Sequence, residues 1–351
     1  MFIIMPFFVR DILPMSRMLL VCFSLLFITN VQAFEPFQPL PEQPPIPRNN
    51  PQSDAKVALG RQLFFDPRLS FTGKVSCNSC HNLALGGEDG RSLSTGALGE
   101  TGTRSTPTLW NVAYQTVYFW DGRAPSLEAA IGEHLLSPAE MGMPNKETVS
   151  GRLFAIEGYR SQFEKVFPGK HAVSYAHVTE ALASYIRTLV TPDGPFDRYL
   201  RGDEKAISQA AVRGFKEYIE TGCASCHFWV NFSGPVPGLA FKMGEGFYEL
   251  FPNYVGTEYD ERYQLLKDEG RILVTGVEGH RYMWRVPSLR NVADTAPYFH
   301  NGSVATLEEA VRLMAKTQLD KDLSVQQLTD IIAFLNTLTG EYPEVEAPEL
   351  P

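Results

Sequence analysis

The 351-residue sequence predicts a mainly α fold made of two duplicated halves, and three observations predict it. Apolar residues recur at helical spacing in most periodic segments. No convincing run shows the alternation that is typical of a β-strand. An internal repeat pairs residues 107–131 with residues 287–311 at a constant offset of 180.

Four segments carry the clearest helical patterns. Residues 175–190 and 324–338 each place apolar side chains on one helical face, and Ser324 provides an N-terminal cap for the second. Residues 55–65 and 206–220 are the other two, and each runs towards a cysteine motif. The apolar stripes predict helices that pack into a core.

Each half contains one copy of the motif Cys-x-x-Cys-His, at Cys77–His81 and Cys223–His227. This spacing is typical of c-type haem attachment, because two close thiols can add to the vinyl groups of one porphyrin while the adjacent imidazole binds iron. A zinc site would need four ligands, and a redox dithiol has no use for the histidine. We expect two covalent haem c groups, attached by Cys77, Cys80, Cys223 and Cys226, with His81 and His227 as iron ligands.

The first 33 residues predict a cleaved export signal. Arg17 provides the positive start, residues 18–28 form an apolar run, and Ala33 ends a small-residue cleavage site. A membrane anchor is the alternative, for which the run is short, and Met15 is an alternative start. We expect a periplasmic protein.

The rest of the chain is expected to form two c-type cytochrome domains, 52–192 and 193–341. A proline-rich leader, 34–51, precedes them and a tail, 342–351, follows, neither with packed structure of its own. The net charge of −9 disfavours nucleic acid as a partner and suits a basic protein.

Longer motifs resemble those of the bacterial di-haem cytochrome c peroxidases and their MauG-like relatives. The resemblance covers nearly the whole exported chain, and includes Leu63–Ser70, Phe119–Ala124, Ala139–Met141 and Thr295–His300. It implies an N-terminal haem at which hydrogen peroxide is reduced to water. It also implies a C-terminal haem that receives electrons from a small cytochrome c or a cupredoxin, and a homodimer.

The resemblance assigns roles to three side chains. Met314 matches the distal ligand of the second haem, where a thioether raises the potential of iron. Trp120 matches a tryptophan between the haems that relays electrons, and Glu140 matches the acid that moves protons during peroxide cleavage. Each residue type also has a plainer interpretation: a core methionine, a core aromatic or a surface glutamate.

The distal side of the first haem departs from the family. Classical members carry a displaceable histidine in a Gly-His-Gly loop, and Ala97 stands at that position here. The repeat offers a replacement, because the offset of 180 takes Met314 to His134. We expect His134 to lie over the first haem, as a ligand or as a proton-transfer group; a half-exposed helix histidine is the alternative.

The family also holds a calcium ion between its domains, which oxygen ligands would suit. Thr295 and Pro297 match the positions that provide backbone carbonyls, and Ser105 replaces the family's asparagine. His300 is expected to bond a haem propionate or the region between the haems.

Two other functions compete with the peroxidase. A MauG-like enzyme would use peroxide to oxidise residues of a partner protein, which the missing distal histidine favours and Met314 disfavours. A non-enzymatic di-haem electron carrier would need His134 firmly bound and would leave Glu140 and Trp120 without a role.

Overall fold

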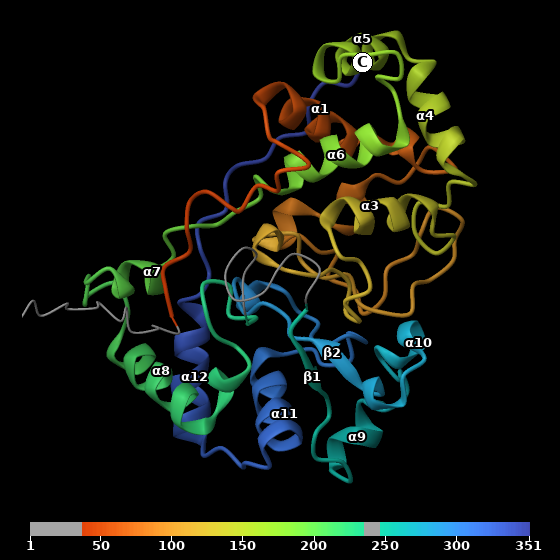
Figure 1. The fold of residues 1–351 in the computed structure, drawn as a ribbon. Helices are drawn as coiled ribbons and strands as arrows, with labels where there is room; N and C mark the ends of the chain where they lie inside the picture. The colour runs from red at the N-terminus through yellow and green to blue at the C-terminus, as the bar shows by residue number, and fades with distance from the viewer. Residues whose placement is uncertain (1–36, 235–245) are drawn as a thin grey trace, which may run out of the picture. The chain divides into compact units, whose positions relative to one another are not determined.

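Helices dominate the computed structural model, as the sequence predicts, and the model describes residues 37–234 and 246–351 (Figure 1). The predicted export signal and the first leader residues lie outside the described residues. Within them, no helix is long and apolar enough to cross a membrane. The helices are α1 (Asp54–Phe65), α2 (Cys77–Cys80), α3 (Leu127–Leu136), α4 (Lys146–Phe154), α5 (Glu157–Val166), α6 (Tyr175–Ile186), α7 (Pro195–Leu200), α8 (Gln209–Thr221), α9 (Glu258–Arg262), α10 (Ile272–Thr275), α11 (Leu307–Leu319) and α12 (Val325–Asn336).

All four predicted helices are present, as α1, α6, α8 and α12. Ser324 caps α12, with its side chain accepting a hydrogen bond from the Gln327 amide. The helix predicted over 175–190 ends earlier, at Ile186. One small sheet was not predicted: β1 (Tyr248–Leu250) pairs antiparallel with β2 (Met283–Arg285). Strands of three residues are too short to show an alternating pattern.

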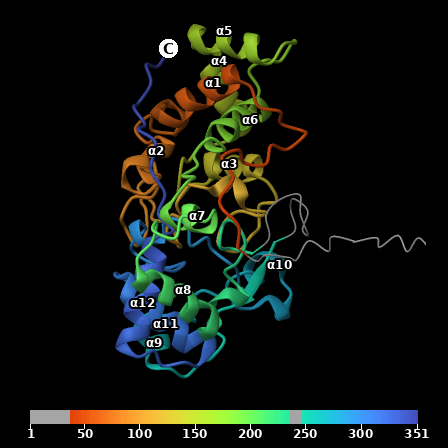
Figure 2. The same ribbon diagram turned by 90° about the vertical axis from the view of Figure 1, so that its left-hand side faces the viewer.

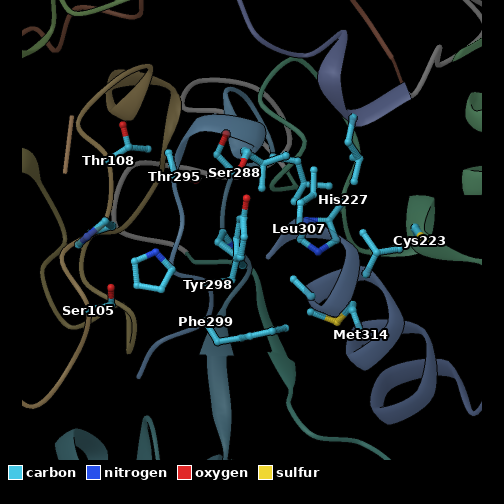
Figure 3. A pocket seen from close by; sticks show the side chains of 18 of the residues that line it. Ser105, Thr108, Cys223, His227, Ser288, Thr295, Tyr298, Phe299, Leu307 and Met314 are labelled. Carbon is cyan, nitrogen blue, oxygen red and sulfur yellow. Dashed lines mark hydrogen bonds between the residues drawn. The ribbon is translucent and has the colours of Figure 1, made fainter. Parts of the chain in front are cut away.

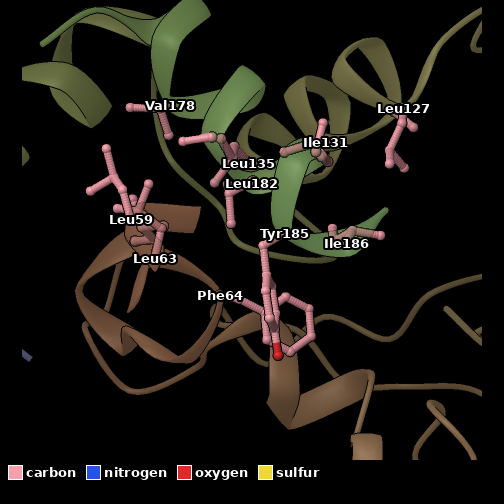
Figure 4. Close-up of a cluster of buried hydrophobic side chains, with 14 of the residues drawn as sticks. Leu59, Leu63, Phe64, Leu127, Ile131, Leu135, Val178, Leu182, Tyr185 and Ile186 are labelled. Atoms are coloured by element: carbon pink, nitrogen blue, oxygen red, sulfur yellow. The ribbon is translucent and has the colours of Figure 1, made fainter. Parts of the chain in front are cut away.

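Two helix pairs form the two main cores. In each pair a glycine lets the backbones touch: a Cβ on Gly60 of α1 would lie 1.9 Å from the Ala181 oxygen of α6, and one on Gly214 of α8 would lie 1.7 Å from the Asp330 oxygen of α12. Figure 4 shows the first core, in which side chains from α1, α3 and α6 meet. Figure 2 shows α8, α11 and α12 together, away from α1, α3 and α6.

The internal repeat folds the same way twice. A 3₁₀ turn over Val112–Tyr114 in the first copy matches one over Val292–Asp294 in the second. Each turn follows an asparagine in the left-handed region, Asn111 at φ 62° and Asn291 at φ 60°. An isolated β-bridge and then a helix, α3 or α11, follow in both copies. The two copies of the repeat are similar in sequence, and they adopt similar local structures.

A buried threonine joins the two copies. Thr191 Oγ1 accepts hydrogen bonds from Asn111 Nδ2 at 2.8 Å and from Asn291 Nδ2 at 3.0 Å. Because Thr191 stands at the predicted domain boundary, this contact ties the halves at the point where the chain passes between them. The boundary itself stays a prediction, since residues 35–351 cluster into one compact unit.

Leader and tail have no helix or strand in the described residues, yet both are packed. Phe37 is buried among side chains of the later half, and Leu40 is buried between Tyr114 of the first half and Trp229 and Val230 of the second. In the tail, backbone oxygens of Glu346 and Pro351 accept hydrogen bonds from Arg61 and Arg68. These proline-rich segments therefore bind to the folded domains as extended chain.

A buried ion pair provides a test of this packing. Asp197 and Arg290 are fully buried and lie 2.8 Å apart, and Asp197 also accepts the Leu40 amide. We expect Asp197→Ala to lower the free energy of unfolding by about 3–5 kcal/mol, because it leaves a buried guanidinium without its counter-charge. Denaturant unfolding measures this loss. Asp193→Asn, which removes the charge of an exposed partner of Arg201 and suits the left-handed backbone at φ 62°, is the control and should cost less than about 1 kcal/mol.

Candidate functional site: two cavities around the repeated motif

Both motif histidines are held in the same way. His81 Nδ1 lies 3.1 Å from the Pro107 oxygen, and His227 Nδ1 lies 3.0 Å from the Phe232 oxygen and also bonds the Pro287 oxygen. Pro107 and Pro287 are equivalent positions of the repeat. A carbonyl needs a donor, so Nδ1 carries the proton in each ring and Nε2 keeps its lone pair.

Each histidine lines a cavity with the cysteines of its own motif. The first cavity, of about 320 Å³, is lined by Cys77, Cys80 and His81. The second is lined by Cys223 and His227, and an adjoining cavity adds Cys226. The structure thus brings each motif together around an enclosed space, as attachment of one flat group would require.

Burial sets the protonation of these groups. It lowers the pKa of His81 to about 4 and also lowers the pKa of His227, so both imidazoles are neutral and able to bind a metal. Burial raises the pKa of the Cys77 thiol to about 12 and that of Cys223 to about 11. Among the described residues no group of three or more His, Cys, Asp or Glu is placed to hold a metal ion, which gives no support to a zinc site.

Two buried polar groups beside the cavities have room for a partner that a haem would provide. Arg285 is 5 % exposed and its side chain donates to the Phe119 and Val286 oxygens; among the described residues no carboxylate forms an ion pair with it, although the more distant Asp121 acts to raise its pKa. His300 Nε2 is buried without a hydrogen bond. Arg285 lines both cavities, so the anionic propionates of haem would fit there.

Arg285 was not predicted as a site residue. The only signal in the sequence is a charged residue two positions before the second repeat copy. Arg285 stands out because it is buried, which the sequence does not show. Burial lowers the pKa of Arg285 to about 10. His300 borders the adjoining cavity and is stacked on Trp284 with ring centroids 4.0 Å apart, and its contact with a haem stays a prediction.

His134 and Glu140 line the first cavity, together with His81. His134 Nδ1 lies 2.6 Å from Glu140 Oε2. Burial acts to raise the pKa of Glu140, but the neighbouring His134, with Arg123, overcomes this effect and holds it below its ordinary value. The two predicted residues therefore form one hydrogen-bonded pair.

The loop around Ala97 packs directly on this pair. The Ala97 amide donates to the Glu140 backbone oxygen at 2.6 Å, and a Cβ on Gly96 would lie 2.2 Å from the Ala139 oxygen. The position that holds a histidine in classical family members therefore lies beside Glu140, and here it offers only a methyl group.

Trp120 and Met314 lie where the resemblance implies. Trp120 lines both cavities, and its indole nitrogen donates to the Ser105 oxygen at 2.8 Å. Met314, on α11, lines the second cavity with His227, and Figure 3 shows both around the same space. Their roles stay predictions.

The three residues predicted for calcium also line one cavity. Ser105, Thr295 and Pro297 all border the second cavity (Figure 3 labels the first two). The Ser105 amide donates to the His300 oxygen at 2.7 Å, which fixes the loop next to the second repeat copy. The calcium ion itself stays a prediction.

Comparison with known proteins agrees with this geometry. The family model described as "Di-haem cytochrome c peroxidase" matches residues 54–205. The chain is 39% identical over 325 residues to a cytochrome c551 peroxidase of Pseudomonas aeruginosa, covering 91% of this chain and 89% of the relative. It is 36% identical to the methylamine utilization protein MauG of Methylorubrum extorquens, covering 89% of this chain and 86% of that protein.

A solved structure supports the same assignment. A MauG-like protein associated with microbial copper homeostasis superposes with a TM-score of 0.76 at 31% identity, covering 85% of this chain and 93% of that one. Fold and duplicated site together define a haem oxidoreductase with two centres. The chain belongs to the di-haem cytochrome c peroxidase family, which includes the MauG proteins.

Proposed function

We propose that this chain is a periplasmic di-haem peroxidase, which reduces hydrogen peroxide to water with electrons from a small cytochrome c or a cupredoxin. One observation carries the proposal: the first cavity is lined by His81 and by the hydrogen-bonded pair of His134 and Glu140. That arrangement provides a metal ligand and a proton-transfer group in one cavity.

Haem, when bound, supplies an iron that takes peroxide and exchanges electrons. Cys77 and Cys80 would hold the first haem and Cys223 and Cys226 the second, and His81 and His227 would each provide an iron ligand. Met314 would complete the second site and keep it closed to peroxide, as suits a centre that only passes electrons.

Glu140 would move the protons. Its lowered pKa keeps it a carboxylate, which can take the proton of bound peroxide and return it to the leaving oxygen. Trp120 would relay electrons, because its indole borders both cavities. Arg285 would bind propionates and so orient the haems.

The MauG-like function is the second candidate, and Ala97 favours it. Without the displaceable loop histidine, the first site suits an enzyme that is ready for peroxide at all times and oxidises a partner protein. A gene for a small exported substrate protein beside this one would favour that candidate, whereas fast turnover with a reduced small cytochrome would favour the peroxidase. An electron carrier would show neither activity. The homodimer stays a prediction.

Covalent attachment gives the first prediction on function. The holoprotein should keep two haems per chain after denaturation and solvent extraction, because thioether bonds survive both. Replacing Cys77 and Cys80 together by alanine should leave one. A pyridine haemochrome assay with protein quantification counts them, and haem lost wholly to the solvent would contradict the proposal.

Glu140→Gln should lower kcat/KM for peroxide by about 10²- to 10⁴-fold, because the amide cannot accept the proton. Stopped-flow mixing with peroxide and a reduced cytochrome c measures the rate. Glu147→Gln, an exposed position on α4, is the matched control and should keep the original rate. Equal rates for both variants would remove Glu140 from the chemistry.

Export makes a separate prediction. When the full gene is expressed with a cytochrome c maturation system, the mature protein in the periplasmic fraction should begin at Phe34. N-terminal sequencing decides this, and a protein that keeps its first 33 residues in the membrane fraction would indicate an anchor instead.

A further inference from the structure

The separation of two histidine rings in the first cavity decides between the two roles open to His134. The centroids of the His81 and His134 rings lie 6.0 Å apart, and the ring planes cross at 81°. His81 belongs to the haem motif and His134 to α3, so the two rings reach the cavity from different parts of the chain.

This distance fits two ligands of one metal ion. A metal bound between imidazoles lies about 2 Å from each nitrogen and about 3.1 Å from each ring centre, so the centres stand about 6 Å apart. A histidine that exchanged a proton with iron-bound peroxide would need an oxygen atom between itself and the metal. With a hydrogen bond of about 2.6–3.2 Å to that oxygen, the ring centres would stand about 8 Å apart.

The surroundings of His134 fix its ring in this position. Glu140 accepts at Nδ1, which leaves Nε2 without a hydrogen bond to any other described residue. The Phe119 ring packs against it with centroids 4.9 Å apart, and the Arg123 guanidinium lies over the Phe119 ring at 3.5 Å from its centroid. A ligand histidine is commonly held in this way, with a carboxylate on its second nitrogen.

The repeat provides an independent argument. His134 and Met314 are equivalent positions, on α3 and α11, and each lines the cavity of its own motif histidine. If the position in the second half provides an axial ligand, the fold brings the equivalent position of the first half to the same side of its haem.

We propose that His134, held by Glu140, is the sixth ligand of the first haem in the resting protein, in place of the loop histidine that Ala97 replaces. This inference rests on the proposed binding of haem in the first cavity. It adds a regulatory property: peroxide reaches the iron only after His134 leaves, and the departing imidazole stays beside the carboxylate that moves the protons.

Low-temperature EPR and optical spectra of the oxidised holoprotein test the ligand directly. Both haems should be low-spin in the unmodified protein. His134→Ala should convert one of the two haems, half of the total, to high-spin, and added imidazole should restore the low-spin signal. His134→Gln keeps a polar side chain of similar length and disturbs the packing less than alanine does. It should also give a high-spin haem, which would show that the change comes from the loss of the imidazole and not from a loss of folding. His171→Ala, an exposed histidine outside both cavities, is the control and should leave both haems low-spin.

A high-spin first haem in the unmodified protein would overturn the inference, as would a spin state that His134→Ala does not change. The spectra do not depend on whether peroxide is the substrate. If His134→Ala becomes high-spin but neither protein consumes peroxide, the ligand assignment stands and the proposed function fails. If the first haem of the unmodified protein is high-spin and the protein turns over peroxide, the ligand assignment fails and the proposed function stands.

Discussion

A hydrogen bond from each motif histidine to a backbone carbonyl is the contact on which both sites depend. In the first half, His81 Nδ1 bonds the oxygen of Pro107, the proline that opens the repeated unit. In the second half, His227 Nδ1 bonds the Phe232 oxygen at 3.0 Å, and the equivalent proline, Pro287, also acts on this ring. The bond fixes the tautomer and leaves Nε2 available to a metal. Because the bond is buried, losing it would leave an unpaired carbonyl as well as a misplaced ring.

The duplication explains how one chain builds two different sites. Both copies place a helix, α3 or α11, across the cavity from the motif, and the residue at the equivalent position is His134 in one and Met314 in the other. In the proposed holoprotein His134 would bind one iron and Met314 the other, and because imidazole and thioether give iron different potentials, the two centres would differ in potential. Thr191 accepts hydrogen bonds from Asn111 and Asn291 and so connects the two copies.

Much of this could be predicted from sequence, and the limits have physical causes. The repeat and the strong apolar stripes predicted the mainly α fold and four helices. The family resemblance selected Glu140, Trp120 and Met314, and the repeat selected His134; all four side chains line the cavities, while their roles stay predictions. Short helices such as α9 and α10 have too few turns to show a stripe. The packing of the leader was missed because a proline-rich segment makes no pattern of its own, although Phe37 and Leu40 fill spaces in distant cores. Arg285 was missed because only the fold shows that this guanidinium is buried beside both cavities.

The buried charge of Arg285 links assembly of this protein to its cofactor. A guanidinium that donates only to carbonyls is costly to bury, and among the described residues no carboxylate forms an ion pair with it, although the more distant Asp121 acts to raise its pKa. In the proposed holoprotein a haem propionate would give Arg285 an anionic partner nearer than Asp121, so that binding of the haem would also stabilise the fold. A chain without its porphyrins would then keep a poorly compensated charge at the junction of its two cavities.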